Sequence, residues 1–164
     1  MEKELREILD AGLAAADPKD AVLRTVRLEG KAVLVEDARF EPERIFVVAA
    51  GKAAGAMARA AEELLDGHIA SGLVVTKEGH DAGPKGFEAV FASHPEPDER
   101  GVEASRKVRE LAESLEEGDL LVALISGGAS ALLADPAPPI KIGDLKRLTQ
   151  DLLKSGADIG EINT

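Results

Sequence analysis

Short apolar runs alternate along this chain with segments in which apolar residues recur every three or four positions. A run of four to eight apolar residues between turn-forming residues is typical of a strand buried in a parallel sheet. Four main runs predict strands, over 45–50, 71–76, 87–92 and 119–125. The third of them is the weakest and is expected nearer a sheet edge. A shorter strand is expected over 32–35.

Helical periodicity fills most of the remaining chain. Leu5, Ile8, Leu9 and Leu13 lie on one face of a helix predicted over 3–16. The small residues after position 52 predict a helix that Gly51 and Gly55 allow to lie close to the sheet. Further helices are predicted to follow the N-cap residues Asp17 and Asp98, to cover 53–64, 129–133 and 145–155, and to end near Gly30, Gly67, Gly118 and Gly156.

Strands and helices that alternate in this way predict an α/β fold, with a mostly parallel sheet covered by helices on both faces. The run over 119–125 contains six consecutive apolar residues and is expected to be buried on both faces. Asp158 and Glu161 form a capping box that should open another helix, yet only three residues follow it. We therefore expect one domain that is truncated at its C-terminal end.

The composition narrows the range of functions. Aromatic residues make up 2% of the 164 residues and cysteine is absent, which excludes disulfides and thiolate metal sites. The formal net charge of −11 disfavours nucleic acid and anionic membranes as partners. It also opposes a nucleotide, unless local cations or a divalent metal compensate. No apolar run approaches the length of about 20 residues that spans a membrane. The N-terminus does not resemble a signal peptide. A cytoplasmic protein is therefore expected.

A lysine, a histidine or a pair of glycines follows each of the four main strands. If these strands are parallel, the loops share one edge of the sheet, where cations and backbone N–H groups can hold an anionic substrate. The loop after 119–125 combines glycines with the start of a helix, which is typical of a phosphate or carboxylate cradle. The residues concerned are Lys52, Lys77, His80, His94 and Ser126-Gly127-Gly128.

Each of these features also has a purely structural interpretation. The glycines can serve only a tight turn, Lys52 can be an exposed residue at a helix start, and His80 can be a structural histidine. His94 lies in a proline-stiffened turn that ends at the N-cap Asp98. The sequence contains no P-loop, no G-x-G-x-x-G motif and no paired metal histidines, and the carboxylates that would bind a metal stay unknown.

Five motifs occur in order over nearly the whole chain, and together they resemble the N-terminal domain of the glycerate 2-kinases of the MOFRL type. Each motif alone is weakly specific, whereas the five in this order are highly specific. The motifs are AGKAA at 50–54, GLVVTKEGH at 72–80, SHPEPDE at 93–99, LISGGASAL at 124–132 and the segment 152–163, which ends in EIN.

The resemblance implies a three-layer α/β/α Rossmann-like domain and the ATP- and Mg²⁺-dependent phosphorylation of D-glycerate to 2-phosphoglycerate. By position, Lys52 matches the catalytic lysine that acts on the transferred phosphate, and Asn163 matches an asparagine that we assign to substrate binding. Ala129 and Glu78 depart from the glycine and the tyrosine that are common in the family. The matching phosphate- or nucleotide-binding loop is Ser126, Gly127, Gly128, Ala129 and Ser130, and the other residues expected to bind substrate are Lys77, His80 and His94.

The chains of that family are more than twice as long as this one, so residues 1–164 are expected to form the N-terminal domain of a longer enzyme. ATP, D-glycerate and the C-terminal domain are its expected partners, and a homodimer stays open. The isolated chain is expected to be inactive, because its cleft lacks the second wall.

Other functions also stay open. Some relatives carry the older name hydroxypyruvate reductase, but the sequence has no dinucleotide motif that would support hydride transfer. The two alternatives are a sugar-phosphate-binding or isomerase-like domain and a non-catalytic module for binding or oligomerisation.

Overall fold

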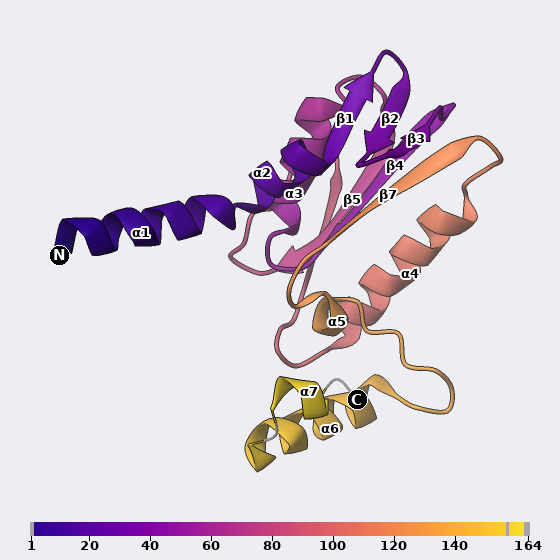
Figure 1. The fold of residues 1–164 in the computed structure, drawn as a ribbon. Helices are drawn as coiled ribbons and strands as arrows, with labels where there is room; N and C mark the ends of the chain where they lie inside the picture. The colour runs from indigo at the N-terminus through magenta and orange to yellow at the C-terminus, as the bar shows by residue number, and fades with distance from the viewer. Residues whose placement is uncertain (1, 157, 163–164) are drawn as a thin grey trace.

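The computed structural model describes residues 2–156 and 158–162, which form a parallel sheet, an antiparallel sheet and surrounding helices (Figure 1). The helices are α1 (Glu2–Ala15), α2 (Pro18–Thr25), α3 (Ala54–Leu64), α4 (Glu99–Glu113), α5 (Ala129–Leu132), α6 (Ile142–Ser155) and α7 (Ile159–Ile162). The strands are β1 (Val26–Glu29), β2 (Ala32–Val35), β3 (Ala38–Phe40), β4 (Arg44–Ala50), β5 (Ile69–Lys77), β6 (Glu88–Ala92) and β7 (Asp119–Ile125).

Four parallel strands form the larger sheet, in the order β6-β5-β4-β7. The four predicted main strands are confirmed, and so is the edge position of the third. Because these strands all run in one direction, the loops that follow them meet at one edge of the sheet. We call this edge the rim, and it consists of the loops 51–53, 78–81, 93–98 and 126–130.

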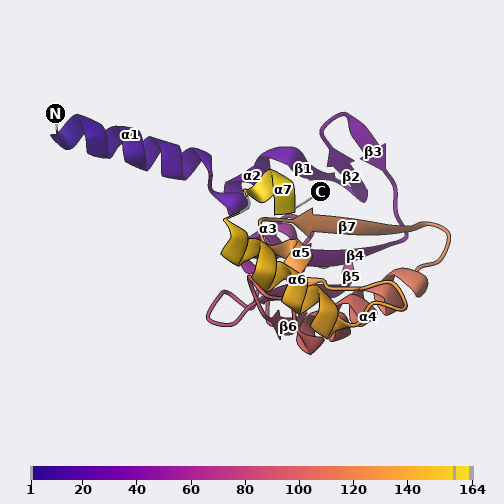
Figure 2. The ribbon, with the colours of Figure 1, turned by 90° about the horizontal axis from the view of Figure 1, so that it is seen from below.

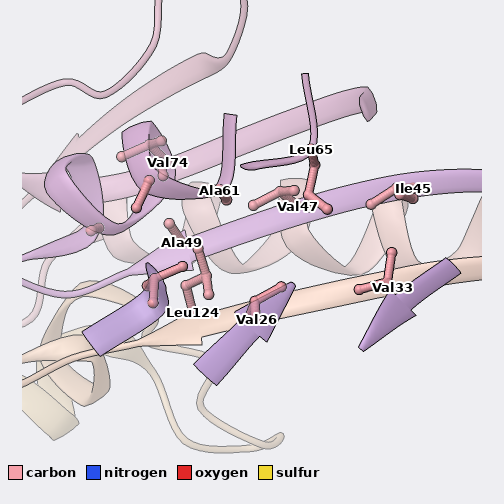
Figure 3. Packing of buried hydrophobic residues seen from close by; sticks show 13 residues of the cluster. Val26, Val33, Ile45, Val47, Ala49, Ala61, Leu65, Val74 and Leu124 are labelled. Atoms are coloured by element: carbon pink, nitrogen blue, oxygen red, sulfur yellow. The ribbon is translucent and has the colours of Figure 1, made fainter. Parts of the chain in front are cut away.

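The two faces of the parallel sheet contribute to two different cores. On one face, Val47, Ala49 and Val74 pack with Val33 of the antiparallel sheet and with Leu65, which follows α3 (Figure 3). The core on the opposite face, under α4 and α5, consists of Val48, Ala50, Leu73, Val75, Ala92, Ala104 and Leu132. Successive residues of β4 therefore enter opposite cores, as the period of two in a strand requires. This arrangement confirms the three-layer α/β/α fold.

The buried face of α3 consists entirely of alanine and glycine, namely Ala54, Gly55, Ala58, Ala60 and Ala61. The glycines of this region do not serve helix–sheet contact as predicted. A Cβ at Gly55 would lie 2.3 Å from the carbonyl oxygen of Asp81, and one at Gly51 would collide with Ser126. Both glycines therefore make room for loops of the rim.

β7 is an edge strand, which corrects the prediction that it is buried on both faces. Leu124 is its one buried residue, whereas Ala123 and Ile125 are exposed. The strand that is buried on both faces is β4, in which six of seven residues are buried. The apolar run correctly predicts a strand, but a hydrophobic sequence carries no information on how many neighbours will pair with it.

The antiparallel sheet is a further correction, since the sequence predicts only its middle strand, β2. α2 ends at Thr25 instead of near Gly30, because Val26 leaves the helix and pairs with Val35 in a hairpin. α4 ends at Glu113, and Gly118, with a φ of 94°, lies in the turn before β7 instead of ending the helix. The helix after the glycine pair is the single turn α5.

Two amphipathic helices bury no residue. α1 projects away from the body, and the leucines and isoleucine of its apolar face are 60–69% exposed (Figure 1). α6 lies at the rim end of the molecule (Figure 2) and contacts the 93–98 loop through Gln150, whose Nε2 donates to Glu96 Oε2 at 2.8 Å. After α6, the predicted capping box forms, with Asp158 and Glu161 exchanging hydrogen bonds of 2.9 and 3.0 Å. None of the helices in the described ranges is long and apolar enough to cross a membrane.

Candidate functional site

The rim begins at the tight turn that leads from β4 towards α3. Gly51 adopts a φ of 121°, which favours glycine, and a Cβ there would lie 2.2 Å from Ser126 Oγ. Lys52 follows directly and is exposed, and its N–H donates to the carbonyl oxygen of Gly127 at 3.0 Å. Gly51 therefore allows the loop after β7 to lie against this turn, which places Lys52 beside the glycine pair.

Ser126 joins the two loops through its backbone and its side chain. Its N–H donates to the carbonyl oxygen of Ala50 at 2.9 Å. Its hydroxyl accepts a hydrogen bond from the N–H of Ala53 at 3.1 Å and donates to Ala50 at 3.3 Å. The Ser126 hydroxyl thus positions the loop, and it has two protein partners before any ligand arrives.

The backbone donors of the 126–130 loop are fewer than the sequence predicts. The N–H of Ser126 is bound to Ala50, and the N–H of Ala129 donates to the carbonyl oxygen of Ser126 at 3.3 Å. For Gly127 and Gly128, the described part of the chain provides no acceptor for the N–H. These two groups are therefore the best candidates for anion binding.

His94 reaches the same place from the loop after β6. A Cβ at Gly128 would lie 2.8 Å from His94 Cδ2, 3.0 Å from His94 Nε2 and 3.6 Å from Lys52 Cε. Gly128 also adopts a φ of 93°, which L side chains rarely adopt. The missing side chain at position 128 therefore lets the imidazole of His94 and the stem of Lys52 meet.

His80 and Lys77 complete the cationic side of the rim. His80 Nδ1 lies 3.1 Å from the carbonyl oxygen of Lys52, and since a carbonyl oxygen only accepts, Nδ1 carries the hydrogen. Lys77 ends β5 and is half-buried, and it pairs in register with Ala92, two residues before His94. Both residues thus belong to the group around Lys52 and His94.

The surroundings of His94 favour the neutral form of its imidazole by lowering its pKa. Burial is the largest cause that lowers the pKa of His94, because it disfavours the charged imidazolium. The positive charges of Lys52, Lys77 and His80 lower this pKa further. His94 is therefore mainly neutral at pH 7, so that it can both donate and accept a hydrogen bond.

Three of the acidic side chains in the rim loops, Glu78, Asp81 and Asp98, are paired with arginines. Arg100 donates to Asp98 at 2.9 Å and to Glu78 at 2.5 Å. Arg59 binds both carboxylate oxygens of Asp81, at 2.7 and 2.9 Å, and lowers the pKa of that carboxyl group. These pairs hold the loops and offset the acidity that Glu78 adds. Neither arginine could be predicted from the sequence, because neither stands in a motif and each pairs with a carboxylate 22 residues away.

The structure brings Lys52, Lys77, His80, His94 and the glycine pair to one edge, while their roles remain predictions. Ser130 is exposed on α5, and Asn163 lies outside the described residues. Across 2–156 and 158–162, no three His, Asp or Glu side chains come together as a metal site. The rim is thus a set of cations and N–H donors, which suits the oxygens of a phosphate or a carboxylate.

Comparison with known proteins shows the family to which the chain belongs. The model of a family described as a domain of unknown function, DUF4147, matches residues 4–164. The chain belongs to this family. Its fold is similar to the crystal structure of a Pyrococcus horikoshii OT3 protein, with a TM-score of 0.82 and 40% identity over 97% of this chain and 37% of the other. It is also similar to the crystal structure of Thermotoga maritima glycerate kinase, with a TM-score of 0.75 and 39% identity over 96% of this chain and 36% of the other.

Several curated relatives of this chain are named as kinases. The chain is 40% identical to the glycerate 2-kinase of Pyrococcus horikoshii over 98% of its own length, and 41% identical to the D-glycerate 2-kinase of Thermotoga maritima over 96%. A protein of Agrobacterium vitis with the provisional name hydroxypyruvate reductase is 41% identical over 98%. These matches cover 37%, 36% and 34% of the three relatives, so the chain spans about a third of their length. The resemblance to the N-terminal region of glycerate 2-kinases is thereby confirmed.

Proposed function

We propose that this chain is the N-terminal part of a glycerate 2-kinase, which transfers the γ-phosphoryl group of ATP to the 2-hydroxyl group of D-glycerate. The observation that carries the proposal is the meeting of Lys52, His80, His94 and the glycine pair at the rim. Two relatives about 40% identical over nearly the whole chain are named glycerate 2-kinases, which supports the same activity. In this proposal, residues 1–164 are the N-terminal domain and a C-terminal domain supplies the second wall of the cleft.

Lys52 is the proposed catalytic residue. The 2-hydroxyl oxygen of glycerate attacks the γ-phosphorus in line and releases its proton to water. A new O–P bond forms, and the bond to the bridging oxygen breaks so that ADP leaves. The ammonium group of Lys52 offsets the negative charge on the transferred group, and the N–H groups of Gly127 and Gly128 bind its oxygens. Ser126 positions this loop, which continues through Ala129 and Ser130.

Lys77, His80 and His94 are proposed to hold glycerate. Lys77 and His80 attract its carboxylate, while the neutral imidazole of His94 forms a hydrogen bond with a hydroxyl group. Asn163 is proposed to complete this set. The pairing of Glu78 with Arg100 supports an anionic substrate here, because it offsets the negative charge that Glu78 adds to the loop after β5.

Mg²⁺ is proposed to enter with the nucleotide. This ion keeps several water molecules and is usually held by substrate phosphates with one or two carboxylates. The positive charges of Lys52 and Lys77 at the rim suit the negative phosphate groups of ATP. A cytoplasmic location is part of the same proposal.

Binding to this chain tests the assignment of the rim. In titrations with ATP and with inorganic phosphate, followed by NMR, we expect amide shifts over 51–53 and 126–130. Lys52→Ala should weaken binding at least about tenfold, because a charge-assisted contact is lost. Lys31→Ala is the matched control, since Lys31 lies in the β1–β2 turn at the opposite end of the parallel sheet (Figure 1). Shifts confined to other regions would contradict the assignment.

Turnover by the complete enzyme tests the catalytic role. Lys52→Ala should lower kcat by about 100- to 1000-fold, the usual loss when one group that stabilises transition-state charge is removed. Analysis of the products by ³¹P NMR, with glycerate and ATP or with a sugar phosphate, separates a kinase from an isomerase. A Lys52→Ala enzyme with near-normal turnover would remove the central residue of the proposal. This chain alone is expected to show no turnover.

A further inference from the structure

Asp81 ends the rim loop that follows β5, and its backbone lies directly against α3. A Cβ at Gly55, in the first turn of α3, would lie 2.3 Å from the carbonyl oxygen of Asp81 and 2.7 Å from its Cβ. Only glycine, which has no Cβ, allows two segments to approach so closely. The loop after β5 therefore packs against the start of the helix that Lys52 and Ala53 precede.

The carboxylate of Asp81 accepts three hydrogen bonds that hold this contact. Arg59, one turn beyond Gly55 on α3, donates to both oxygens, and the N–H of Gly83 donates to Oδ1 at 3.0 Å. The hydrogen bonds from Arg59 are the largest cause of the lowered pKa of Asp81, so the group is charged at pH 7. Both side chains of the ion pair are about half exposed, where such a pair alone adds little stability. The pair therefore serves the position of the loop more than the stability of the fold.

His80 directly precedes Asp81, and its ring contacts the turn before α3. Nδ1 lies 3.1 Å from the carbonyl oxygen of Lys52, and the backbone N–H of His80 donates to the carbonyl oxygen of Lys77 at 3.1 Å. Because a carbonyl oxygen only accepts, the hydrogen stays on Nδ1 in both the neutral and the charged ring. Nε2 is therefore the ring nitrogen that can meet a ligand. The same contact ties His80 to the backbone of the proposed catalytic residue.

We propose that Asp81 is a positioning residue of the substrate site and acts through His80. Its contacts with α3 fix the loop, which keeps His80 Nδ1 on the carbonyl oxygen of Lys52 and leaves Nε2 to the substrate. A loop released from α3 would let the ring turn away or exchange tautomers, and the site would lose a fixed partner for an anion. The inference rests on the proposed function, in which His80 attracts the carboxylate of glycerate.

¹⁵N NMR of the His80 ring in this chain tests the positioning without any turnover. At about pH 9, where an ordinary imidazole is neutral, the unmodified chain should show one tautomer, with the hydrogen on Nδ1. Asp81→Ala removes the carboxylate, and Gly55→Ala displaces the loop while leaving every charge in place. Each variant should give a mixture of the two tautomers.

Two controls match these variants outside the rim. Asp135→Ala removes a carboxylate that pairs with Arg109, and Gly12→Ala adds a methyl group to a helix glycine with open space around it. Both controls should leave the His80 spectrum unchanged. A His80 spectrum that is also unchanged in Asp81→Ala and Gly55→Ala would overturn the proposal.

Turnover by the complete enzyme measures the consequence for the substrate. Asp81→Ala should raise the KM for D-glycerate about tenfold, the effect of one lost charge-assisted contact, and should change kcat and the KM for ATP less than about twofold. A merely less stable enzyme would instead lose kcat at unchanged KM. Asp81→Asn keeps an oxygen that can accept from Gly83 and should have an intermediate KM for glycerate.

The two measurements separate this inference from the proposed function. A KM for glycerate in Asp81→Ala within about twofold of the unmodified enzyme would overturn the positioning role. An enzyme that does not phosphorylate glycerate would refute the proposed function, and the His80 spectrum would still decide whether Asp81 positions the ring.

Discussion

β4 and β7 are neighbours in the parallel sheet with similarly apolar sequences, yet they end in different surroundings. Six of the seven residues of β4 are buried, whereas one of seven is buried in β7. The register places Val47 beside Val122. Among the strands that the structure describes, β4 pairs with one on each side, while β7 pairs with β4 alone. The comparison teaches that an apolar run decides that a strand forms, and its position in the sheet decides how far it is buried.

The loop after β4 is tightly packed, whereas the loop after β7 is exposed. Gly51, directly after β4, packs so closely against Ser126 that a Cβ would lie 2.2 Å from its Oγ. Its φ of 121° is also a conformation that L side chains rarely adopt. Gly127, after β7, is exposed, and a Cβ there would have Lys52 Cε as its nearest neighbour, at 4.0 Å. The first loop is therefore a fixed support, and the second presents its backbone to a ligand.

The largest effect is expected from a side chain at the first of these glycines. Gly51→Ala combines backbone strain with a clash against Ser126, and it should lower the free energy of unfolding by about 3 kcal/mol or more. Gly127→Ala has space and should cost about 1 kcal/mol or less. Urea denaturation followed by circular dichroism measures both. Equal losses of unfolding free energy for the two variants would show that contact with Ser126 does not restrict position 51 to glycine.

A smaller effect is expected from truncation of the paired valines. Val47→Ala removes fully buried methyl groups and should cost about 2 kcal/mol, whereas Val122→Ala should cost less than about 1 kcal/mol. Urea denaturation of the two variants measures the difference. A cost at Val122 that matches the cost at Val47 would mean that β7 is as deeply buried in solution as β4.

The smallest effect concerns the first residues of the two strands, Arg44 and Asp119. Arg44 donates to both carboxylate oxygens of Asp119, at 2.8 and 2.6 Å, and this is the first cause of the lowered pKa of Asp119. A carboxylate with a lowered pKa stabilises the folded state above its unfolded pKa of about 3.9. That contribution is lost as the pH falls through the lower folded value.

Asp119→Asn tests this linkage. The variant should have a slightly lower urea midpoint at pH 7 and a weaker loss of stability between about pH 4 and pH 2. Asp151→Asn, on the exposed surface of α6, is the matched control, because it removes one carboxylate outside this pair. Identical acid dependence in the Asp119→Asn variant and the unmodified chain would exclude a role for the pair.

Much of the candidate site is visible in the sequence. The apolar runs reveal the parallel strands, and the residues directly after each run are those that meet at the rim, including Lys52, His80 and His94. This succeeds because strand direction and chain order place all βα loops at one edge, whatever the details of packing. The N-caps Asp17 and Asp98 and the capping box at Asp158 are equally local and are confirmed.

The sequence alone therefore determines the elements, their alternation and the edge at which chemistry gathers, because these depend on periodicity and on neighbours along the chain. Only the tertiary structure decides that β4 is central and β7 is at the edge, that Arg59 and Arg100 neutralise the acids of the rim, and that Gly127 and Gly128 are the available donors. It also decides that α1 stands apart from the body (Figure 1). These outcomes depend on contacts between segments far apart in the chain, whose partners no local pattern of apolar and polar residues encodes.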